Sequence, residues 1–280
     1  MKIKIFGTEY QLSKRELTPI IDDYPKPSHK LLGHQRFEGK TALVVGGNSG
    51  IGLSVVNIFL REGAYVIATA RRKGELEYLD NPNLEFMQWD ISDVLQTKAV
   101  IDRIYNRFGH IDIIVNNAGV NVLKNNNGVS EKERLVNETT FIHSVNVIGI
   151  SEICKAVIAK VKANDHIHKP KIINVISAGA LLSCTGAYFT SKYAILSFTK
   201  ALYEENKDIA YIYGICPGEV RTKMIRHKGF TLFSRYAKDK RKAHPDEIGE
   251  LALMLAGEAG NYLNGQIMVI DGGETILKQF

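Results

Sequence analysis

The chain has 280 residues, of which 45% are hydrophobic and 24% are charged, proportions that are typical of a globular domain. It holds no uninterrupted run of about 18 apolar residues, so no membrane span is expected. The N-terminus lacks a sustained apolar core and a small-residue cleavage site, so no signal peptide is expected. A net charge of +6 raises the question of a nucleic-acid partner, and three cysteines without metal or disulfide spacing favour a reducing cytoplasm.

Residues 1–38 differ in character from the remainder of the chain. They carry Pro19, Pro25 and Pro27, mixed charge and little periodicity. We expect a short strand or hairpin followed by an extended arm. Residues 39–280 show no internal repeat and no domain-sized linker, so they are interpreted as a single domain.

From Lys40 onward, short apolar runs alternate with helical patterns. Alternation of this kind predicts an α/β fold of the Rossmann type, which is a doubly wound parallel seven-stranded sheet with helices on both faces. Strands are expected at 41–45, 65–69, 84–89, 111–115, 171–176, 209–215 and 266–270. Helices are expected at 51–61, 92–108, 131–163, 186–206 and 245–256.

The first strand runs directly into a glycine-rich turn, and a helix begins there. Glycines allow a tight turn and a close backbone approach to a pyrophosphate, while the helix N-terminus offers free N–H groups to an anion. The turn therefore predicts a dinucleotide site. Its spacing is Gly-x-x-x-Gly-x-Gly, and its candidate contacts are Gly46, Asn48, Ser49, Gly50, Ile51 and Gly52.

The end of the second strand bears on the choice of dinucleotide. An acidic residue at this point binds a ribose 2′-hydroxyl, whereas an arginine suits a 2′-phosphate. The chain has Arg71 and Arg72 here and no acid. A guanidinium can hold a phosphate through two hydrogen bonds, so NADP(H) is predicted in preference to NAD. The alternative is that both arginines are solvated loop residues.

Tyr188 and Lys192 lie four residues apart in a predicted helix. Residues at this spacing share one helix face, so the lysine ammonium can favour ionisation of the phenol. Such pairs are frequent on ordinary surface helices. The pair gains meaning only from the cofactor turn upstream, with which it predicts acid/base chemistry beside a bound dinucleotide.

Taken together, these motifs resemble the single-domain branch of the short-chain dehydrogenase/reductase family over roughly residues 39–275. Several further motifs of that family occur in the expected order. They are Asp90, Asn116-Asn-Ala-Gly119, Asn146, Ser177, Pro217-Gly-Glu-Val-Arg-Thr222 and Asp271-Gly-Gly273.

The resemblance implies a catalytic set of Asn146, Ser177, Tyr188 and Lys192. Tyr188 would be the acid/base, and Ser177 would hydrogen-bond the same substrate oxygen. Lys192 would bind the nicotinamide ribose and lower the pKa of the tyrosine. Asn146 would position a water that links the lysine to solvent. Ser177 lies only 11 residues before Tyr188, a short spacing for the family, so Ser183 is an alternative.

The resemblance also adds cofactor contacts. Asp90 is similar to the residue that meets the adenine amino group, and from the residues alone Asp90 and Ser92 compete as helix N-cap. Thr222 is similar to the residue that bonds the nicotinamide carboxamide. The other implied contacts are Ile91, Asn117, Ala118, Gly119, Tyr188, Lys192, Pro217, Gly218 and Val220.

A basic segment runs from Arg221 to Lys242, with nine Lys or Arg residues and one acid. It lies where the resemblance places a lid over the substrate, at about residues 221–243. Two interpretations remain open, which are a solvated loop and a contact for an anionic substrate. Phe230, Leu232, Phe233 and Tyr236 lie between these charges and could serve packing or recognition. A nucleic-acid role lacks any recognised reader motif.

The leading hypothesis is an NADP(H)-dependent oxidoreductase acting on a carbonyl or secondary alcohol, in which a 3-oxoacyl thioester and a free ketone are both open as substrates. The alternative is a cofactor-binding sensor or scaffold without catalysis. No metal is expected, since His166 and His168 merely flank Ile167 in a loop. Cys184 is interpreted as packing. No membrane or nucleic-acid partner is predicted, and the family resemblance implies a homo-oligomer, a tetramer or a dimer.

Overall fold

The structure is a computed structural model. It describes residues 35–121, 130–164, 168–182, 185–224, 234, 237–238 and 240–276, together with the backbone of 2–5 and 8–11. The chain divides into two compact units, Met1–His34 and Gln35–Phe280. In the first unit, β1 (Lys2–Ile5) and β2 (Thr8–Gln11) pair as an antiparallel hairpin. The sequence analysis expected either a short strand or a hairpin here. The predicted arm that follows lies outside the described residues.

The second unit is built on a seven-stranded sheet in the order β5-β4-β3-β6-β7-β8-β9, and every neighbouring pair is parallel. The predicted fold class is therefore confirmed. The strands are β3 (Thr41–Val45), β4 (Tyr65–Ala70), β5 (Leu84–Gln88), β6 (Ile113–Asn116), β7 (Lys171–Val175), β8 (Tyr211–Pro217) and β9 (Ile267–Ile270).

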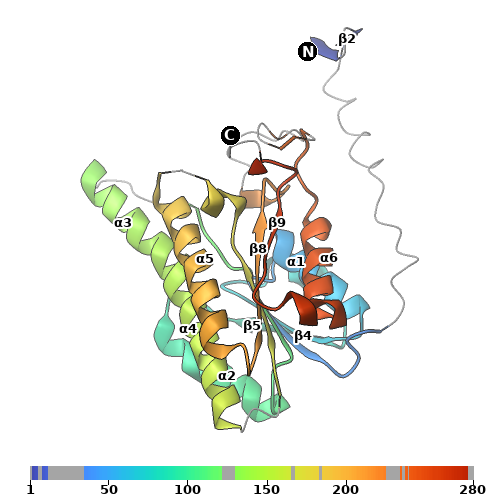
Figure 1. Cartoon of the computed structure of the whole chain (residues 1–280), viewed down its shortest axis with the longest axis vertical. Coiled ribbons are helices and arrows are strands. Elements are labelled where there is room, and N and C mark those ends of the chain that lie inside the picture. The colour runs from blue at the N-terminus through green and yellow to red at the C-terminus, as the bar shows by residue number, and fades with distance from the viewer. Residues whose placement is uncertain are drawn as a thin grey trace. The chain divides into compact units, whose positions relative to one another are not determined.

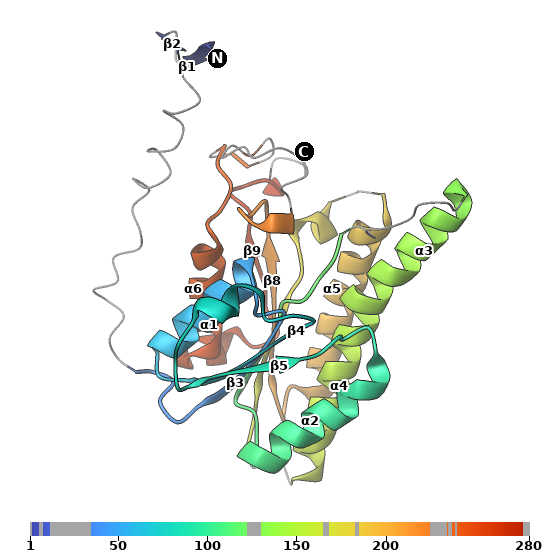
Figure 2. The ribbon, with the colours of Figure 1, turned by 180° about the vertical axis from the view of Figure 1, so that it is seen from behind.

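Helices cover both faces of this sheet, with α1 and α6 together on one face and α2, α4 and α5 on the other (Figure 1; Figure 2 shows the reverse view). The helices are α1 (Gly50–Arg61), α2 (Val94–Phe108), α3 (Glu131–His143), α4 (Ile150–Ala163), α5 (Ala187–Asn206) and α6 (Pro245–Ala256). Short turns of helix are η3 (Gly74–Tyr78), η4 (Ser144–Gly149), η5 (Ala178–Leu181) and η7 (Glu258–Leu263).

The chain reverses its direction of growth across the sheet between β3 and β6. From β3 it moves outward to β4 and β5, and it then returns to place β6 on the other side of β3. Ligands of open α/β sheets bind in the crevice at the carboxyl ends of the strands where this reversal occurs. The glycine turn after β3 and Asn117 after β6 both lie at that point.

Apolar content explains why the central strands are inside. All five residues of β3 and all four of β6 are buried, as expected for a parallel strand covered by helices on both faces. Largest among the fully buried side chains are Trp89, Tyr213 and Phe59, which fill the space between sheet and helices. Burying such side chains is the main favourable term in folding, at roughly 25 cal/mol per Å².

The helical run Glu131–Ala163 is long and apolar enough to cross a membrane on length and composition alone, and it is the single such run in the described part of the chain. Charged residues lie within this run, so it contains no uninterrupted apolar stretch of about 18 residues. In the structure, 56% of its apolar window is buried against the rest of the domain. Packing against α2 and α5 therefore accounts for its apolarity.

A buried polar network joins two central strands to the helices beside them. The Nδ2 of Asn116 on β6 donates to Oδ1 of Asn174 on β7, at 2.8 Å. The Nδ2 of Asn174 donates to Oγ1 of Thr199 on α5, at 2.9 Å. The Cys154 thiol on α4 adjoins both amides, and burial raises its pKa to about 12, so it stays a neutral packing group.

Replacing Thr199 by Val is expected to lower the free energy of unfolding by about 1–3 kcal/mol, because the buried amide of Asn174 loses its acceptor. Thr139→Val is the matched control, since it makes the same change at an exposed position of α3 and should stay within about 0.5 kcal/mol. Urea denaturation followed by circular dichroism measures both. Equal effects in the two variants would show that the network contributes nothing.

Candidate active site

The glycine turn after β3 leaves no room for a side chain at Gly46 or Gly52. The backbone of Gly46 has φ of +78°, a conformation that glycine adopts without strain. A methyl group at Gly46 would lie 2.7 Å from the backbone of Ala118, and one at Gly52 would lie 2.1 Å from the Gly46 carbonyl oxygen. Asn117 donates to that same oxygen from its Nδ2, at 2.9 Å. The residues predicted from the turn and from the segment after β6 therefore lie together.

Gly52→Ala is expected to weaken dinucleotide binding at least tenfold and to lower the free energy of unfolding by about 1–3 kcal/mol, because the added methyl overlaps the turn. Gly39→Ala is the control, since it strains a positive φ of +72° in open space away from the turn. It should lose stability and keep affinity. Fluorescence titration with NADPH and thermal melts separate the two effects. Full affinity in Gly52→Ala would exclude the turn as the binding element.

The N-terminus of α1 is open to an anion. Its N-cap residue Ser49 makes no side-chain capping bond, and the first turn carries no acidic residue. Unsatisfied backbone N–H groups and the helix dipole favour a negative charge there. Gly50, with φ of +56°, keeps the approach clear, and a methyl on it would lie 2.9 Å from the Thr222 side chain. These features fit the pyrophosphate of a dinucleotide.

Arg71 and Arg72 directly follow β4, and both side chains are exposed. Neither forms an ion pair with a residue that the structure describes. The backbone oxygen of Arg72 accepts from Asn48 Nδ2 at 3.1 Å, which ties this loop to the glycine turn. The sequence showed no acid at the end of the strand, but Glu75 lies nearby in η3. Its carboxylate pairs with Lys223 from the far side of the turn, so it is already neutralised.

The side chain of Asn146 is fixed by the backbone opposite it. Its Nδ2 donates to the Val120 oxygen at 2.8 Å and its Oδ1 accepts from the Val120 N–H at 2.8 Å. Nδ2 also approaches Ser191 Oγ, at 3.0 Å. Asn146 lies in η4, a π-helical turn, and such turns are frequent at functional sites. The sequence pattern predicted one continuous helix here and missed both this turn and the contact with Ser191.

Tyr188 and Lys192 lie on α5 and face the ends of β6 and β7. Lys192 is buried, with 4% of its surface exposed, and its Nζ donates to the Val175 oxygen at 3.1 Å. The same Nζ is 5.9 Å from the centre of the Tyr188 ring. A methyl on Gly119 would lie 3.5 Å from both Lys192 Nζ and Asn146 Oδ1. Residues from three separate motifs thus converge on one point.

Burial controls the acid–base properties of this pair. It raises the pKa of the Tyr188 phenol, and a hydrogen bond with Ser177 opposes that rise. It lowers the pKa of Lys192 to about 8. The sequence analysis predicted that Lys192 lowers the pKa of Tyr188. In the protein chain alone the pKa of Tyr188 is raised instead, because the loss of solvation outweighs the opposing effect of Ser177. Ser177 lies close enough to the Tyr188 phenol to influence its pKa, whereas Ser183 lies outside the described residues.

Lys192→Met is expected to stabilise the protein at pH 7, by on the order of 3 kcal/mol. Below about pH 8 the folded protein bears the full cost of a buried ammonium. Between pH 8 and 10.5 the folded lysine is neutral while the unfolded one remains charged, so this cost shrinks as pH rises. The stability difference between variant and wild type, measured by urea denaturation, should decline over that window. A pH-independent difference would contradict the assignment.

Asp90 and Ile91 follow β5 at the predicted position. Both helix-cap expectations for this segment were wrong, because the N-cap of α2 is Asp93, whose side chain accepts from the Leu95 N–H. Asp90 instead accepts from the N–H and hydroxyl of Ser92, at 3.0 and 2.7 Å. Ile91 is buried, and its carbonyl oxygen packs against Gly149 in the same π-helical turn that carries Asn146.

The segment after β8 begins as the motif predicted. Gly218 donates to the Ile270 oxygen, and Val220 bridges to Ala243 beyond the basic segment. Among the described basic residues, Lys223 pairs with Glu75 and Arg241 pairs with Glu247. This reduces the charge that either could offer an anionic substrate. Residues 225–233, 235–236 and 239, which include the four aromatic and aliphatic candidates, lie outside the described residues, as do His166 and Cys184.

The sequence matches the short chain dehydrogenase family over residues 40–230. The chain belongs to the short-chain dehydrogenase/reductase family. It is an oxidoreductase of that family, and the family binds a nicotinamide cofactor. Oxidoreductase UcpA of Salmonella typhimurium is 33% identical over 263 residues, covering 86% of this chain and 96% of that protein.

Other members of the short-chain dehydrogenase/reductase family carry more specific names. A 3beta-hydroxysteroid dehydrogenase 2 of Eggerthella lenta is 30% identical, covering 84% of this chain and 94% of that protein. A 3-oxoacyl-[acyl-carrier-protein] reductase FabG of Chlamydia trachomatis is 30% identical, covering 84% and 96%. A solved structure of a Pseudomonas aeruginosa RhlG/NADP active-site complex has the same fold, with a TM-score of 0.74 at 24% identity, covering 87% of this chain and 99% of that one.

Proposed function

We propose that this chain transfers a hydride between NADP(H) and a carbonyl or secondary alcohol, with Tyr188 as the acid/base. The observation that carries the proposal is the convergence of Ser177, Tyr188 and Lys192 at the carboxyl edge of the sheet, with Asn146 behind them. A site that only binds a dinucleotide has no need of a tyrosine close to both a serine hydroxyl and a buried ammonium.

In reduction, the Tyr188 phenol donates its proton to the carbonyl oxygen as that oxygen gains negative charge. The Ser177 hydroxyl donates a hydrogen bond to the same oxygen. NADPH, when bound, supplies the hydride to the carbonyl carbon. In oxidation each transfer runs in reverse, and the tyrosinate accepts the proton of the alcohol. The raised pKa of Tyr188 keeps the phenol protonated at neutral pH, which suits it to the reductive direction.

Lys192 supports this chemistry from its buried position. Its ammonium lies within reach of the tyrosine ring and favours the tyrosinate that remains after proton donation. Asn146, locked by Val120, forms a fixed polar wall beside Lys192 where a water could link the lysine to solvent. Two groups of fixed geometry behind the reacting phenol leave little to reorganise during the reaction.

Cofactor selection is assigned to Arg71, with Arg72 assisting. What supports this is that both guanidinium groups are exposed beside the glycine turn and are not neutralised by a described acid. Glu75, the nearest carboxylate on η3, is occupied by Lys223. A 2′-phosphate would therefore meet positive charge without competition from a free acid.

The proposed substrate class is a ketone, either free or within a 3-oxoacyl thioester. Relatives named for each kind, a hydroxysteroid dehydrogenase and a 3-oxoacyl reductase, support a carbonyl next to a sizeable apolar group. The test is NADPH consumption with 3-oxoacyl thioesters beside free ketones of matched chain length. Turnover with either set supports the reaction class and selects the substrate. Tight NADPH binding without turnover of any member would favour a sensor instead.

We also propose that this chain forms a homo-oligomer. Four large apolar side chains on the long helices are exposed. They are Leu135 and Val136 on α3, Ile148 on η4 and Tyr193 on α5. Large apolar groups are normally covered when they cluster. Light scattering coupled to size exclusion should give a mass of two or four chains. A monomer at micromolar concentration would contradict this.

A further inference from the structure

A second cluster of chemically active side chains lies at the opposite edge of the sheet. Asp112 directly precedes β6, and His168 lies three residues before β7, so both are at the amino ends of strands whose carboxyl ends form the proposed active site. His110 comes from the turn after α2. The proposed reaction uses none of these residues.

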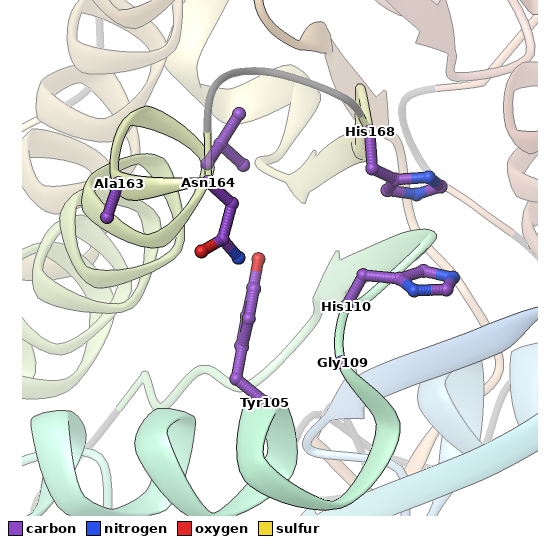
Figure 3. A pocket seen from close by; sticks show the side chains of 7 residues that line it. Tyr105, Gly109, His110, Ala163, Asn164 and His168 are labelled. Atoms are coloured by element: carbon purple, nitrogen blue, oxygen red, sulfur yellow. The ribbon is translucent and has the colours of Figure 1, made fainter.

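The three side chains point at one another. His110 Nε2 is 3.3 Å from one Asp112 oxygen, and His168 Nε2 is 3.3 Å from the other. The imidazole rings lie one above the other, with centroids 4.3 Å apart (Figure 3). One donor atom from each residue falls within 4.8 Å of the others. Ligands of a tetrahedral Zn²⁺ are separated by roughly 3.3 Å, so modest side-chain rotation would bring these atoms to bonding distance.

One buried ring nitrogen of this cluster lacks a hydrogen-bond partner among the described residues. The Nε2 atom of His168 is buried and has no hydrogen-bond partner among the described residues, despite its approach to Asp112. Buried polar nitrogens of this kind are normally satisfied by protein, water or an ion.

We propose that His110, His168 and Asp112 form a Zn²⁺ site. Two imidazoles with one carboxylate are a common donor set for this ion, and a fourth ligand is supplied by solvent or a small molecule. The two histidines also line an adjoining pocket of about 500 Å³, together with Tyr105 and Asn164 (Figure 3).

The surroundings of Asp112 both support and oppose a metal. The Thr41 N–H donates to one carboxylate oxygen at 2.8 Å, which holds the ligand in place as outer-shell partners do. Lys40 Nζ lies 2.9 Å from the other oxygen and would compete with a cation. Its side chain is 48% exposed and can turn toward solvent when the ion binds.

The test is a titration of the full chain with Zn²⁺ by isothermal titration calorimetry in a non-chelating buffer. We expect one ion per chain, with affinity at least tenfold weaker in His110→Ala and in His168→Ala. His143→Ala, on α3 and remote in sequence from the cluster, is the matched control and should leave binding unchanged. Lys40→Met should bind Zn²⁺ more tightly, because it removes the competing ammonium.

The Lys40→Met arm separates a metal site from a merely structural cluster, which would gain no affinity. Absence of stoichiometric Zn²⁺ binding to the wild type would overturn the proposal, as would equal affinity in His168→Ala and His143→Ala. Circular dichroism checks that each variant is folded. NADPH-dependent turnover is measured in parallel, so that failure of the metal site and failure of the proposed function are seen independently.

Discussion

Tyr188→Phe should lower turnover by about 10²–10⁴-fold while changing the dissociation constant for NADPH by less than about threefold. The variant keeps the aromatic ring against Phe189 and removes only the group that Ser177 contacts and that donates the proton. The ring still fills its place, so the fold should be unaffected. Steady-state kinetics with the best carbonyl substrate, and fluorescence titration with NADPH, give the two quantities.

Tyr193→Phe is the matched control for this prediction. It makes the same chemical change five residues further along α5, on a side chain that is 64% exposed. Turnover in Tyr193→Phe should equal that of the wild type. If Tyr188→Phe retained wild-type turnover, the proton would have to come from another group, and the proposed role of Tyr188 would be abandoned.

Arg71→Asp should reverse the preference between NADPH and NADH. Loss of charge-assisted hydrogen bonds to the 2′-phosphate, together with repulsion from the new carboxylate, is expected to lower kcat/KM for NADPH by about 10–100-fold. The same carboxylate can accept hydrogen bonds from a ribose 2′-hydroxyl, so kcat/KM for NADH should be maintained or increased. The two cofactors are compared at a fixed, saturating carbonyl concentration.

The control for Arg71→Asp is Lys73→Asp, which makes the same change of charge at an exposed position two residues later. A general electrostatic effect would lower NADPH efficiency similarly in both variants. A specific contact would act at Arg71 alone. An unchanged cofactor preference in Arg71→Asp would refute the assignment of Arg71, whatever the control shows.

Most of the fold was predictable because short-range patterns carry it. The run Thr41–Val45 is apolar at every position and ends in glycines, which marks a buried parallel strand before a phosphate-binding turn. Its predicted bounds agree with the structure, and α6 begins and ends where predicted, at Pro245 and Ala256. The predicted strand at 209–215 was less accurate, since β8 runs from Tyr211 to Pro217.

Other features depend on contacts that no periodicity encodes. The π-helical turn Ser144–Gly149 interrupts a run that reads as one helix, and within it Gly149 packs closely against the Ile91 carbonyl from a distant strand end. The helix before it begins with a capping box formed by Ser130 and Glu133, which the sequence analysis did not predict. Sequence spacing paired His168 with His166, whereas the fold places His168 beside His110, 58 residues earlier.

The central claim is hydride transfer at the site around Tyr188, and isotope transfer tests it most directly. The wild-type chain is incubated with a carbonyl substrate and with NADPH carrying deuterium at one C4 position, for each of the two positions in turn, and the product is examined by mass spectrometry. One of the two labels is expected to appear on the carbinol carbon, with one deuterium per alcohol formed. Alcohol without label from either position, or no alcohol while NADPH binds, would contradict the account.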